Sequence, residues 1–491
     1  MCGIVGVRIF HNSDKWKEKI KSLVFSTEAR GRDGFGMVLK TPSSLEILKK
    51  RVRMSEAAAE VSSFLENIRV GSMLIVSSRA QPLPEESSVS TDNIPPFVSR
   101  SKEWWVVHNG TISNDKELAK ELGITVSVDT QVIAEMLSKF SSVKKICEKL
   151  VGGFAVVAMA PVYGHFLVFK NYKTLWYVWN EDLFAVASER EQLLPFAKSR
   201  IYGVEMFPRD MIFSVKENGK IIMQPFNREV FGSIPPLDDN KAVVVTSGGL
   251  DSSTAAFVAK KIHGKDIVLL NFDYGQRAAE REWEAVQAVA KKLGTEARRI
   301  DLKWLGALGK SPLTDRNIEL PLGMRSVEST LCFVPARNFV MIAYAAAVAE
   351  AEGRKWIYYG NNLEEEGVYP DNDREFIHTM NEALAYGTLR GGIKIRNCLS
   401  RLMKVEIVAL GTHLGVPFES TWSCDTEGVK VGDKILPCGI CGCCTTRWHA
   451  FRRAGIPDPE QYAQEPIDKY PWLKRKETTK IDVKELISRL E

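Results

Sequence analysis

The segment from residue 243 to residue 262 constrains the fold of this chain more than any other. Val243 to Thr246 form an apolar, β-branched run that is typical of a buried strand. A helical pattern extends from Thr254 to Ile262. Glycines let backbone amides approach a phosphate, hydroxyl groups add donors, and the beginning of a helix adds partial positive charge. The segment therefore predicts a phosphate-binding loop between a strand and a helix, formed by Ser247, Gly248, Gly249, Leu250, Asp251, Ser252 and Ser253.

The length of 491 residues predicts two or three domains. Hydrophobic residues make up 45% of the chain and charged residues 26%, which excludes a disordered or fibrous protein. The net charge of +5 permits an anionic partner but does not require one. The longest apolar stretches, such as residues 339–349, are too short to cross a bilayer, and the first residues do not form a secretory signal. We therefore expect a cytoplasmic protein with no membrane partner.

A change of pattern divides the chain near residues 231–240, where the sequence reads F-G-S-I-P-P-L-D-D-N and predicts a linker. Strands alternate with helix-length stretches after it, which predicts a doubly wound parallel sheet in a domain of residues 241–491. Residues 2–230 are expected to form the other domain. Short β-like runs dominate there, at residues 73–76, 104–107, 155–159 and 166–169.

Five of the nine cysteines crowd into residues 424–444, which points to a metal site rather than to disulfides. Cys438, Cys441 and Cys444 follow a Cys-x2-Cys-x2-Cys spacing, and Cys424 supplies a fourth thiolate. Four such sulfurs suit tetrahedral Zn²⁺ in a structural role. An iron–sulfur cluster is the alternative. Cys443 fits the spacing less well, although it could replace Cys444.

Cys2 follows the initiator methionine, which can be removed before a residue as small as cysteine. The thiol would then share its residue with an α-amino group that can act as its base. Further segments resemble, in order, the class II glutamine amidotransferases, a family of N-terminal nucleophile (Ntn) glutaminases, over roughly residues 2–225. These segments are Met1–Gly6, Arg30–Gly34, Ser78-Arg79, His108–Gly110, Asp129-Thr130 and Val151–Ala155.

This resemblance implies an α-β-β-α sandwich and a set of catalytic roles. Cys2 would attack the side-chain amide of glutamine, and the Asn109 side chain with the Gly110 amide would hold the oxyanion. Arg79 and Asp129 would grip the carboxylate and the amino group of glutamine by charge pairing.

The glycine-rich loop resembles that of the N-type ATP pyrophosphatases, which cleave ATP between its α and β phosphates. It is not a Walker motif, because no Gly-Lys-Ser/Thr follows. The resemblance implies that Ser247 and Ser252 donate to the departing pyrophosphate and that Asp251 helps to hold Mg²⁺.

Segments beyond the loop resemble the 7-cyano-7-deazaguanine synthases over roughly residues 241–465. The resemblance implies a substrate site formed by Tyr274, Gln276, Arg277, Arg337 and Asn338. The chain departs from that family where Asn372 stands in place of a cysteine and Ala278 in place of a histidine, and where Arg374 is shifted by one. The segments that carry the resemblance are Phe272–Arg277, Val334–Asn338, Tyr369–Asp371, Thr421–Cys424, Cys438–Cys441 with Cys444, and Ala454–Pro459.

The two halves together resemble the glutaminase–QueC fusions of some archaea, which are associated with archaeosine formation in tRNA. Our leading interpretation is a glutamine-dependent amidotransferase that converts the nitrile of 7-cyano-7-deazaguanine in tRNA into an amidine. The alternative is glutamine- and ATP-dependent synthesis of the free cyano base from 7-carboxy-7-deazaguanine. An asparagine-synthetase-like enzyme, or a glutaminase with a non-catalytic nucleotide- or RNA-binding domain, is a further alternative. The expected partners are glutamine, ATP with Mg²⁺, and a 7-deazaguanine base that is free or in tRNA; a homo-oligomer is left open.

Overall fold

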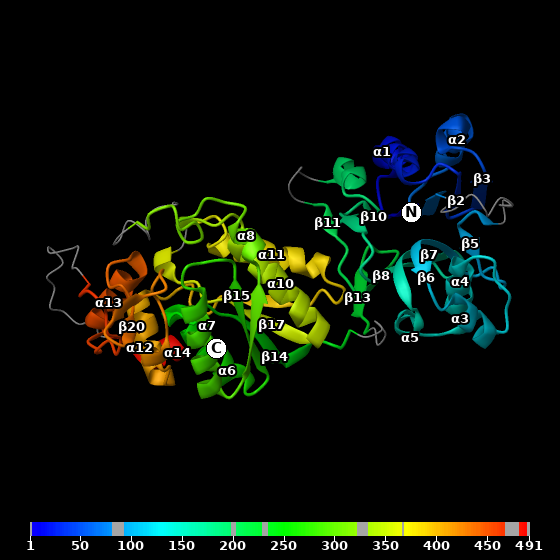
Figure 1. Cartoon of the computed structure of the whole chain (residues 1–491). Helices are drawn as coiled ribbons and strands as arrows, with labels where there is room; N and C mark the ends of the chain where they lie inside the picture. The colour runs from blue at the N-terminus through cyan, green and yellow to red at the C-terminus, as the bar shows by residue number, and fades with distance from the viewer. Residues whose placement is uncertain are drawn as a thin grey trace. The chain divides into compact units, whose positions relative to one another are not determined.

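The computed structural model describes residues 2–80, 93–197, 203–227, 234–321, 332–365, 368–466 and 481–488. The chain divides into two compact units, Met1–Gly232 and Ser233–Glu491 (Figure 1). No helix in the described ranges is both long and apolar enough to span a bilayer.

The first unit contains two antiparallel sheets. The seven-stranded sheet has the order β11 (Glu205–Met206), β9 (Trp176–Trp179), β10 (Leu183–Ala187), β1 (Gly3–Ile9), β4 (Met73–Arg79), β2 (Gly34–Lys40), β3 (Leu45–Lys50). The six-stranded sheet has the order β13 (Ile221–Pro225), β12 (Met211–Val215), β8 (His165–Lys170), β7 (Gly152–Ala160), β6 (Trp105–Ile112), β5 (Phe97–Val98). All four β-like runs predicted in this half lie wholly or mostly within β4, β6, β7 and β8.

Side-chain alternation along the strands explains why the two sheets stack. Val5 and Val7 of β1 pack on the helices α1 (Ser13–Ser26) and α2 (Ala58–Leu65), whereas Ile4 packs in the core between the sheets. In β6, Val106 packs on the opposite helical layer and Val107 between the sheets. Because successive side chains of a strand point to opposite faces, each sheet is buried on both sides. The opposite helical layer consists of α3 (Asp115–Leu122), α4 (Asp129–Lys139) and α5 (Val143–Lys149). The predicted α-β-β-α sandwich is confirmed.

The second unit is built on a five-stranded parallel sheet. Its strand order is β16 (Glu296–Asp301), β15 (Ile267–Asp273), β14 (Asp238–Val245), β17 (Arg354–Tyr358), β18 (Lys394–Arg396). The chain order reverses between β14 and β17, and in doubly wound sheets such a reversal opens a crevice at the carboxyl ends of the strands. A small hairpin of β19 (Val429–Val431) and β20 (Lys434–Leu436) lies apart from this sheet in the topology.

Helices cover both faces of the parallel sheet (Figure 1). Ala242 and Val244 of β14 face one helical layer, and Val243 and Val245 face the other. The first layer contains α6 (Leu250–His263), α7 (Ala279–Leu293), α12 (Lys404–Leu414), α13 (Gly442–Ala454) and α14 (Val483–Ser488). The second contains α8 (Lys303–Gly306), α10 (Arg337–Glu352) and α11 (Arg374–Gly387). The predicted doubly wound fold is confirmed.

Candidate active sites

The first candidate site lies where β1 begins. Gly3 of β1 pairs with Ser78 of β4, so the next pair in this antiparallel register is Cys2 with Arg79. Gly31 lies against the same strand end, because a Cβ at Gly31 would be 2.4 Å from the carbonyl oxygen of Ser78. The sequence segments that resemble a glutaminase at these positions therefore meet at one edge of the first sheet.

Asn109 and Gly110 lie on β6 of the second sheet, and β6 contacts both β1 and β4. Gly110 has φ of 149°, and a Cβ there would be 1.9 Å from the Gly153 carbonyl oxygen and 2.8 Å from His108 Nε2. Only glycine fits this backbone. The Asn109 side chain is buried.

Asp129 begins α4, and its carboxylate already has protein partners. Oδ2 accepts a hydrogen bond from the Ile112 amide at 2.9 Å and lies 3.8 Å from His108 Nδ1. Asn93 connects this region to Arg79: its carbonyl oxygen accepts from the Arg79 guanidinium, and its Oδ1 accepts from Ser127 at 2.9 Å. The roles predicted for Cys2, Arg79, Asn109, Gly110 and Asp129 stay predictions, and the structure relates their segments through these contacts.

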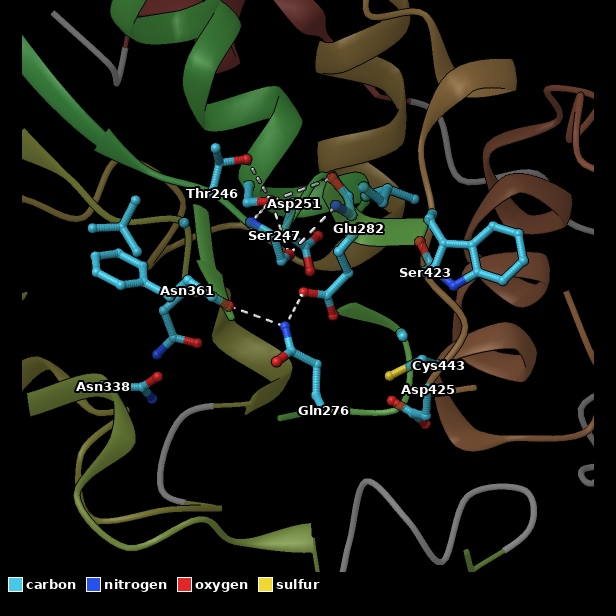
Figure 2. Close-up of a pocket in the computed structure, with 18 of the residues that line it drawn as sticks. Thr246, Ser247, Asp251, Gln276, Glu282, Asn338, Asn361, Ser423, Asp425 and Cys443 are labelled. Atoms are coloured by element: carbon cyan, nitrogen blue, oxygen red, sulfur yellow. Dashed lines mark hydrogen bonds between the residues drawn. The ribbon is translucent and has the colours of Figure 1, made fainter. Parts of the chain in front are cut away.

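The second candidate site is the loop after β14 (Figure 2). The Ser252 hydroxyl lies 3.1 Å from the Ser247 hydroxyl and accepts from the Ser247 amide at 3.2 Å. Gly248 has φ of 75° and turns the chain, and Gly249 caps the N-terminus of α6. The helix begins at Leu250, four residues before the predicted start, so the backbone amides of its first turn belong to the loop.

A cavity of about 290 Å³ opens at the carboxyl ends of β14, β15 and β17. Five of the seven loop residues predicted to bind ATP line it; Gly248 and the buried Ser253 do not. Its lining residues from the loop and the neighbouring strands include Thr246, Ser247, Gly249, Leu250, Asp251, Ser252, Asn271, Phe272, Tyr359 and Gly360.

A buried charge cluster lies beside the loop. Lys404 Nζ, at the beginning of α12, is 3.1 Å from Asp251 Oδ2 and 2.9 Å from Glu365 Oε1. Burial raises the pKa of Asp251 to about 6, and the Lys404 ammonium opposes this rise. The second oxygen, Oδ1 of Asp251, is buried and has no hydrogen-bond partner among the described residues. The carboxylate oxygens of Asp251 and Glu365 are hard ligands of the kind that Mg²⁺ binds.

Four of the five residues predicted to bind the substrate line the same cavity: Tyr274, Gln276, Arg337 and Asn338. Arg277 is not among the lining residues. Its guanidinium donates instead to the carbonyl oxygens of Pro312, Asp315 and Ile318, at 2.9, 3.1 and 2.6 Å. Because Leu313 of this segment lines the cavity, Arg277 supports the wall rather than facing the interior.

Both replaced residues of the deazaguanine-synthase pattern also line the cavity. Asn372 accepts a hydrogen bond from the Tyr359 hydroxyl at 3.0 Å, and Ala278 stands at the beginning of α7. The neighbouring Asp371 accepts from the Asn338 amide at 3.0 Å. The wall therefore has its own hydrogen bonds where the sequence departs from that pattern.

Sequence reasoning missed several polar residues of the cavity. Asn271 lies on β15 and the others on helices or loops, and the place of each depends on the tertiary fold. Only Glu282, six residues after Gln276 on the same turn and helix, offered a local signal. The missed lining residues are Asn271, Glu282, Tyr359, Asn361, Glu365, Lys404, Asp425, Cys443 and Arg447.

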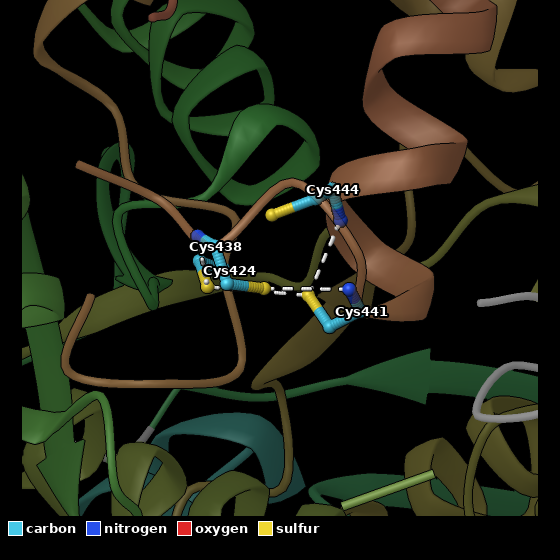
Figure 3. Close-up of side chains that lie close together, drawn as sticks. All are labelled: Cys424, Cys438, Cys441 and Cys444. Atoms are coloured by element: carbon cyan, nitrogen blue, oxygen red, sulfur yellow. Dashed lines mark hydrogen bonds between the residues drawn. The ribbon is translucent and has the colours of Figure 1, made fainter. Parts of the chain in front are cut away.

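Four buried cysteines form a candidate metal centre (Figure 3). The sulfurs of Cys424, Cys438, Cys441 and Cys444 all lie within 4.8 Å of one another. The Cys424 and Cys441 sulfurs are 4.0 Å apart, close to the separation of about 3.8 Å expected for two sulfurs about 2.3 Å from a tetrahedral Zn²⁺. The Cys438, Cys441 and Cys444 amides point at neighbouring sulfurs at 3.3–3.5 Å, which favours thiolates. This group could hold a structural metal such as zinc.

Cys443 does not belong to this group and lines the cavity instead. The metal centre and the phosphate loop are nevertheless joined. Trp422, two residues before Cys424, donates its amide to the Gly248 carbonyl oxygen at 2.9 Å. Arg447 donates to Thr421 Oγ1 at 2.7 Å and pairs with Asp458 at 3.1 Å.

Comparison with known proteins assigns both units to families. The family described as "Queuosine biosynthesis protein QueC" matches residues 241–455, and the family described as "Glutamine amidotransferase domain" matches residues 87–195. A "7-cyano-7-deazaguanine synthase" of Saccharolobus solfataricus is 32% identical over 489 residues, covering 95% of this chain and 100% of that protein. A "7-cyano-7-deazaguanine synthase 2" of Sulfurisphaera tokodaii is also 32% identical, covering 94% and 100%. The protein of that name from Nitratiruptor sp. is 40% identical over 223 residues, which is 45% of this chain and 98% of the relative.

Proposed function

The chain belongs to the 7-cyano-7-deazaguanine synthase family, in the form that joins a glutamine amidotransferase domain to a QueC domain, and we propose from this premise that it transfers glutamine-derived ammonia to the 7-substituent of a 7-deazaguanine. One observation carries the proposal. A single cavity contains both the phosphate loop, with Ser247 and Ser252, and the polar groups of Tyr274 and Arg337. ATP and an acceptor can therefore meet there.

In the first unit, we propose that Cys2 becomes the terminal residue and that its α-amino group takes the thiol proton. The thiolate attacks the side-chain amide carbon of glutamine, and the oxyanion accepts hydrogen bonds from Asn109 and the Gly110 amide. Ammonia leaves with the transferred proton. Water then hydrolyses the thioester, which releases glutamate and regenerates Cys2.

In the second unit, the carboxylate of 7-carboxy-7-deazaguanine is the acceptor that the site explains most completely. One carboxylate oxygen attacks the α-phosphorus of ATP and pyrophosphate leaves. Ammonia displaces AMP from the acyl adenylate and forms an amide. A second ATP adenylylates the amide oxygen and releases pyrophosphate, and loss of AMP and of both amide N–H protons gives the nitrile.

The residues around the loop suit the charge changes of these steps. The Ser247 and Ser252 hydroxyls and the amides at the beginning of α6 would donate to the pyrophosphate, where negative charge develops. Asp251 and Glu365 now pair with Lys404. Once these two carboxylates bind a cation, the Lys404 ammonium would be a buried positive charge that is free to face the phosphates. Asp251 and Glu365 would hold Mg²⁺, which neutralises phosphate charge when bound. The four-cysteine centre would hold Zn²⁺ as a structural ion.

A second candidate acceptor is the nitrile of 7-cyano-7-deazaguanine in tRNA, which ammonia would convert into the amidine of archaeosine. The replaced wall residues Asn372 and Ala278 favour this candidate, because a changed wall suits a changed acceptor. The phosphate loop favours the first candidate, because addition of ammonia to a nitrile needs positioning but no activated leaving group.

One assay separates the two acceptors. The enzyme receives glutamine, Mg²⁺ and ATP with either the carboxy base or tRNA that bears the cyano base, and both products are identified by mass. We expect the free cyano base, with two AMP per product. An amidine in tRNA formed without AMP would establish the second candidate, and glutamine hydrolysis with neither product would reject the proposed function.

A further inference from the structure

Gln276 lies in the cavity, but its hydrogen-bonding groups are already used. Its Oε1 accepts from the Tyr274 amide at 2.9 Å, and its Nε2 donates to the Phe272 carbonyl oxygen at 3.0 Å and to Glu282 Oε2 at 2.8 Å (Figure 2). Both amide hydrogens therefore have acceptors within the same turn and helix. Gln276 therefore holds the carboxylate of Glu282 in place and does not itself bind a ligand.

Glu282 extends into the cavity from the first turns of α7. One carboxylate oxygen is held by Gln276, and no group among the described residues donates a hydrogen bond to the other, Oε1. Burial raises the pKa of Glu282 to about 7, which the Gln276 hydrogen bond and the Arg337 charge oppose. A partly buried carboxylate oxygen without a donor is a costly arrangement that a ligand with N–H groups would relieve.

Arg337 provides the opposite charge in the wall of the same cavity. Its Nη1 donates to the Tyr274 hydroxyl at 3.1 Å, its Nε to Asn338 Oδ1 at 3.3 Å, and its guanidinium lies 5.3 Å from the centre of the Tyr274 ring. These contacts fix the plane of the guanidinium. Its Nη2 makes no hydrogen bond with the described residues, so the cavity that both residues line has a donor on Arg337 and an acceptor on Glu282.

We propose that Glu282 and Arg337 read the lactam edge of the 7-deazaguanine acceptor, and that Glu282 thereby selects bases that carry a 2-amino group. This inference rests on the proposed function. The ring N1–H and the 2-amino group are adjacent donors that match the two oxygens of one carboxylate, and O6 is an acceptor that matches a guanidinium. A base with oxygen at position 2 would place an acceptor against Glu282. Gln276 and Tyr274 act as positioning residues.

The test compares two bases in the full-length enzyme with ammonium as the nitrogen source, so that glutamine hydrolysis is not needed. The bases are 7-carboxy-7-deazaguanine and its analogue without the 2-amino group. We expect the wild type to prefer the amino base about 10- to 100-fold in kcat/KM, as for one hydrogen bond to a charged group. Glu282→Gln should convert the two bases at similar rates while its KM for ATP stays unchanged.

The control is Glu284→Gln, which makes the same chemical change on the exposed side of the same helix and should keep the wild-type preference. An unchanged preference in Glu282→Gln would overturn the inference. So would a raised KM for ATP with the base preference intact, since Glu282 would then contact ATP.

Failure of the proposed function is seen separately, in the wild type. If the wild type converts neither base, calorimetry measures the binding of both. Stronger binding of the amino base, lost in Glu282→Gln, would reject the reaction and keep the inference. Equal binding of the two bases would reject both.

Discussion

Lys404 illustrates how single residues prepare the second unit for a highly charged ligand. The isolated burial of an ammonium is costly, but here Asp251 and Glu365 compensate it. Burial lowers the pKa of Lys404, the two carboxylates raise it more, and the result lies well above the usual value. The residue therefore stays charged, and a phosphate group that entered beside the loop would meet a cation already in place.

Cys2 gives the first residue-scale prediction. Cys2→Ala should abolish glutamine hydrolysis while ammonium still supports the acceptor reaction, because only the nucleophile of the first unit is lost. Asn109→Ala should lower the hydrolysis rate by about two to three orders of magnitude, as for one oxyanion donor. Glutamate release measures both. Unchanged glutamine turnover in Cys2→Ala would remove the assignment of the nucleophile.

Glu282 predicts a pH dependence whose sign follows from its raised pKa. The folded-state value of about 7 exceeds the reference value of about 4.3. Between these values the folded protein holds a proton that the unfolded chain has released, so this group lowers stability as pH rises through that window. Burial is the main cause of the raised pKa; Gln276 and Arg337 lower it, and Asp425 and Asp273 raise it.

Glu282→Gln removes this titration. The Tm of the variant relative to wild type should therefore increase from pH 5 to pH 8, as measured by calorimetry. The kcat/KM of wild type for the carboxy base should rise up to about pH 7, since the ionised carboxylate accepts the base, and the variant should lack that limb. A variant whose pH profile matches wild type would assign the limb to another group.

At the scale of elements, local sequence was sufficient for the loop but not for its surroundings. A strand, two glycines and a helix are adjacent in sequence, so the segment around Gly248 could be predicted. The partners of Asp251 could not, because Asn362 and Lys404 follow it by more than one hundred residues and reach it only through the sheet. The same reason explains why Arg277 was expected in the cavity. Its motif indicates which segment lies near the cavity but not which way the Arg277 side chain points.

Gly248 gives a prediction for the packing of the loop on α7. A Cβ there would lie 2.8 Å from the Glu282 carbonyl oxygen and 3.0 Å from the Val286 amide nitrogen, both of which are backbone atoms. Gly248→Ala should therefore displace the loop and raise the KM for ATP at least tenfold. Gly294→Ala is the matched control, because its φ of 62° is similar but its Cβ would meet no atom of the described part of the chain within 4 Å. It should cost only about 1 kcal/mol of stability and leave the KM unchanged.

The cysteine centre gives a second prediction at this scale. Cys438→Ser or Cys441→Ser should release the metal and lower the Tm, because metal binding contributes to folding. Trp422 links this segment to Gly248, so the KM for ATP should also rise. Metal content is measured by emission spectroscopy. Cys443→Ser is the control and should retain the metal, since Cys443 lies outside the group of four; full retention in a Cys438 and Cys441 double variant would remove the site.

At the scale of the whole molecule, the chain combines a unit that would release ammonia with a unit that would consume it. Each unit has its own sheets and cores, so each fold is explained without the other. The proposed reaction of the second unit, unlike its fold, would depend on the ammonia that the first unit releases. At neutral pH water protonates most of the free ammonia, and the ammonium form has no lone pair with which to attack an adenylate.

This dependence predicts the source of the transferred nitrogen. Glutamine labelled with ¹⁵N in its side-chain amide is supplied together with a large excess of unlabelled ammonium, and the isotope in the product is measured by mass spectrometry. We expect most of the product to carry ¹⁵N, because the transferred ammonia reaches the acceptor before it equilibrates with the solution. Cys2→Ala should give only unlabelled product under the same conditions, and Cys443→Ser, which leaves the first unit unchanged, should resemble wild type in its isotope ratio. A wild-type product whose label follows the ratio in solution would mean that the two units react independently.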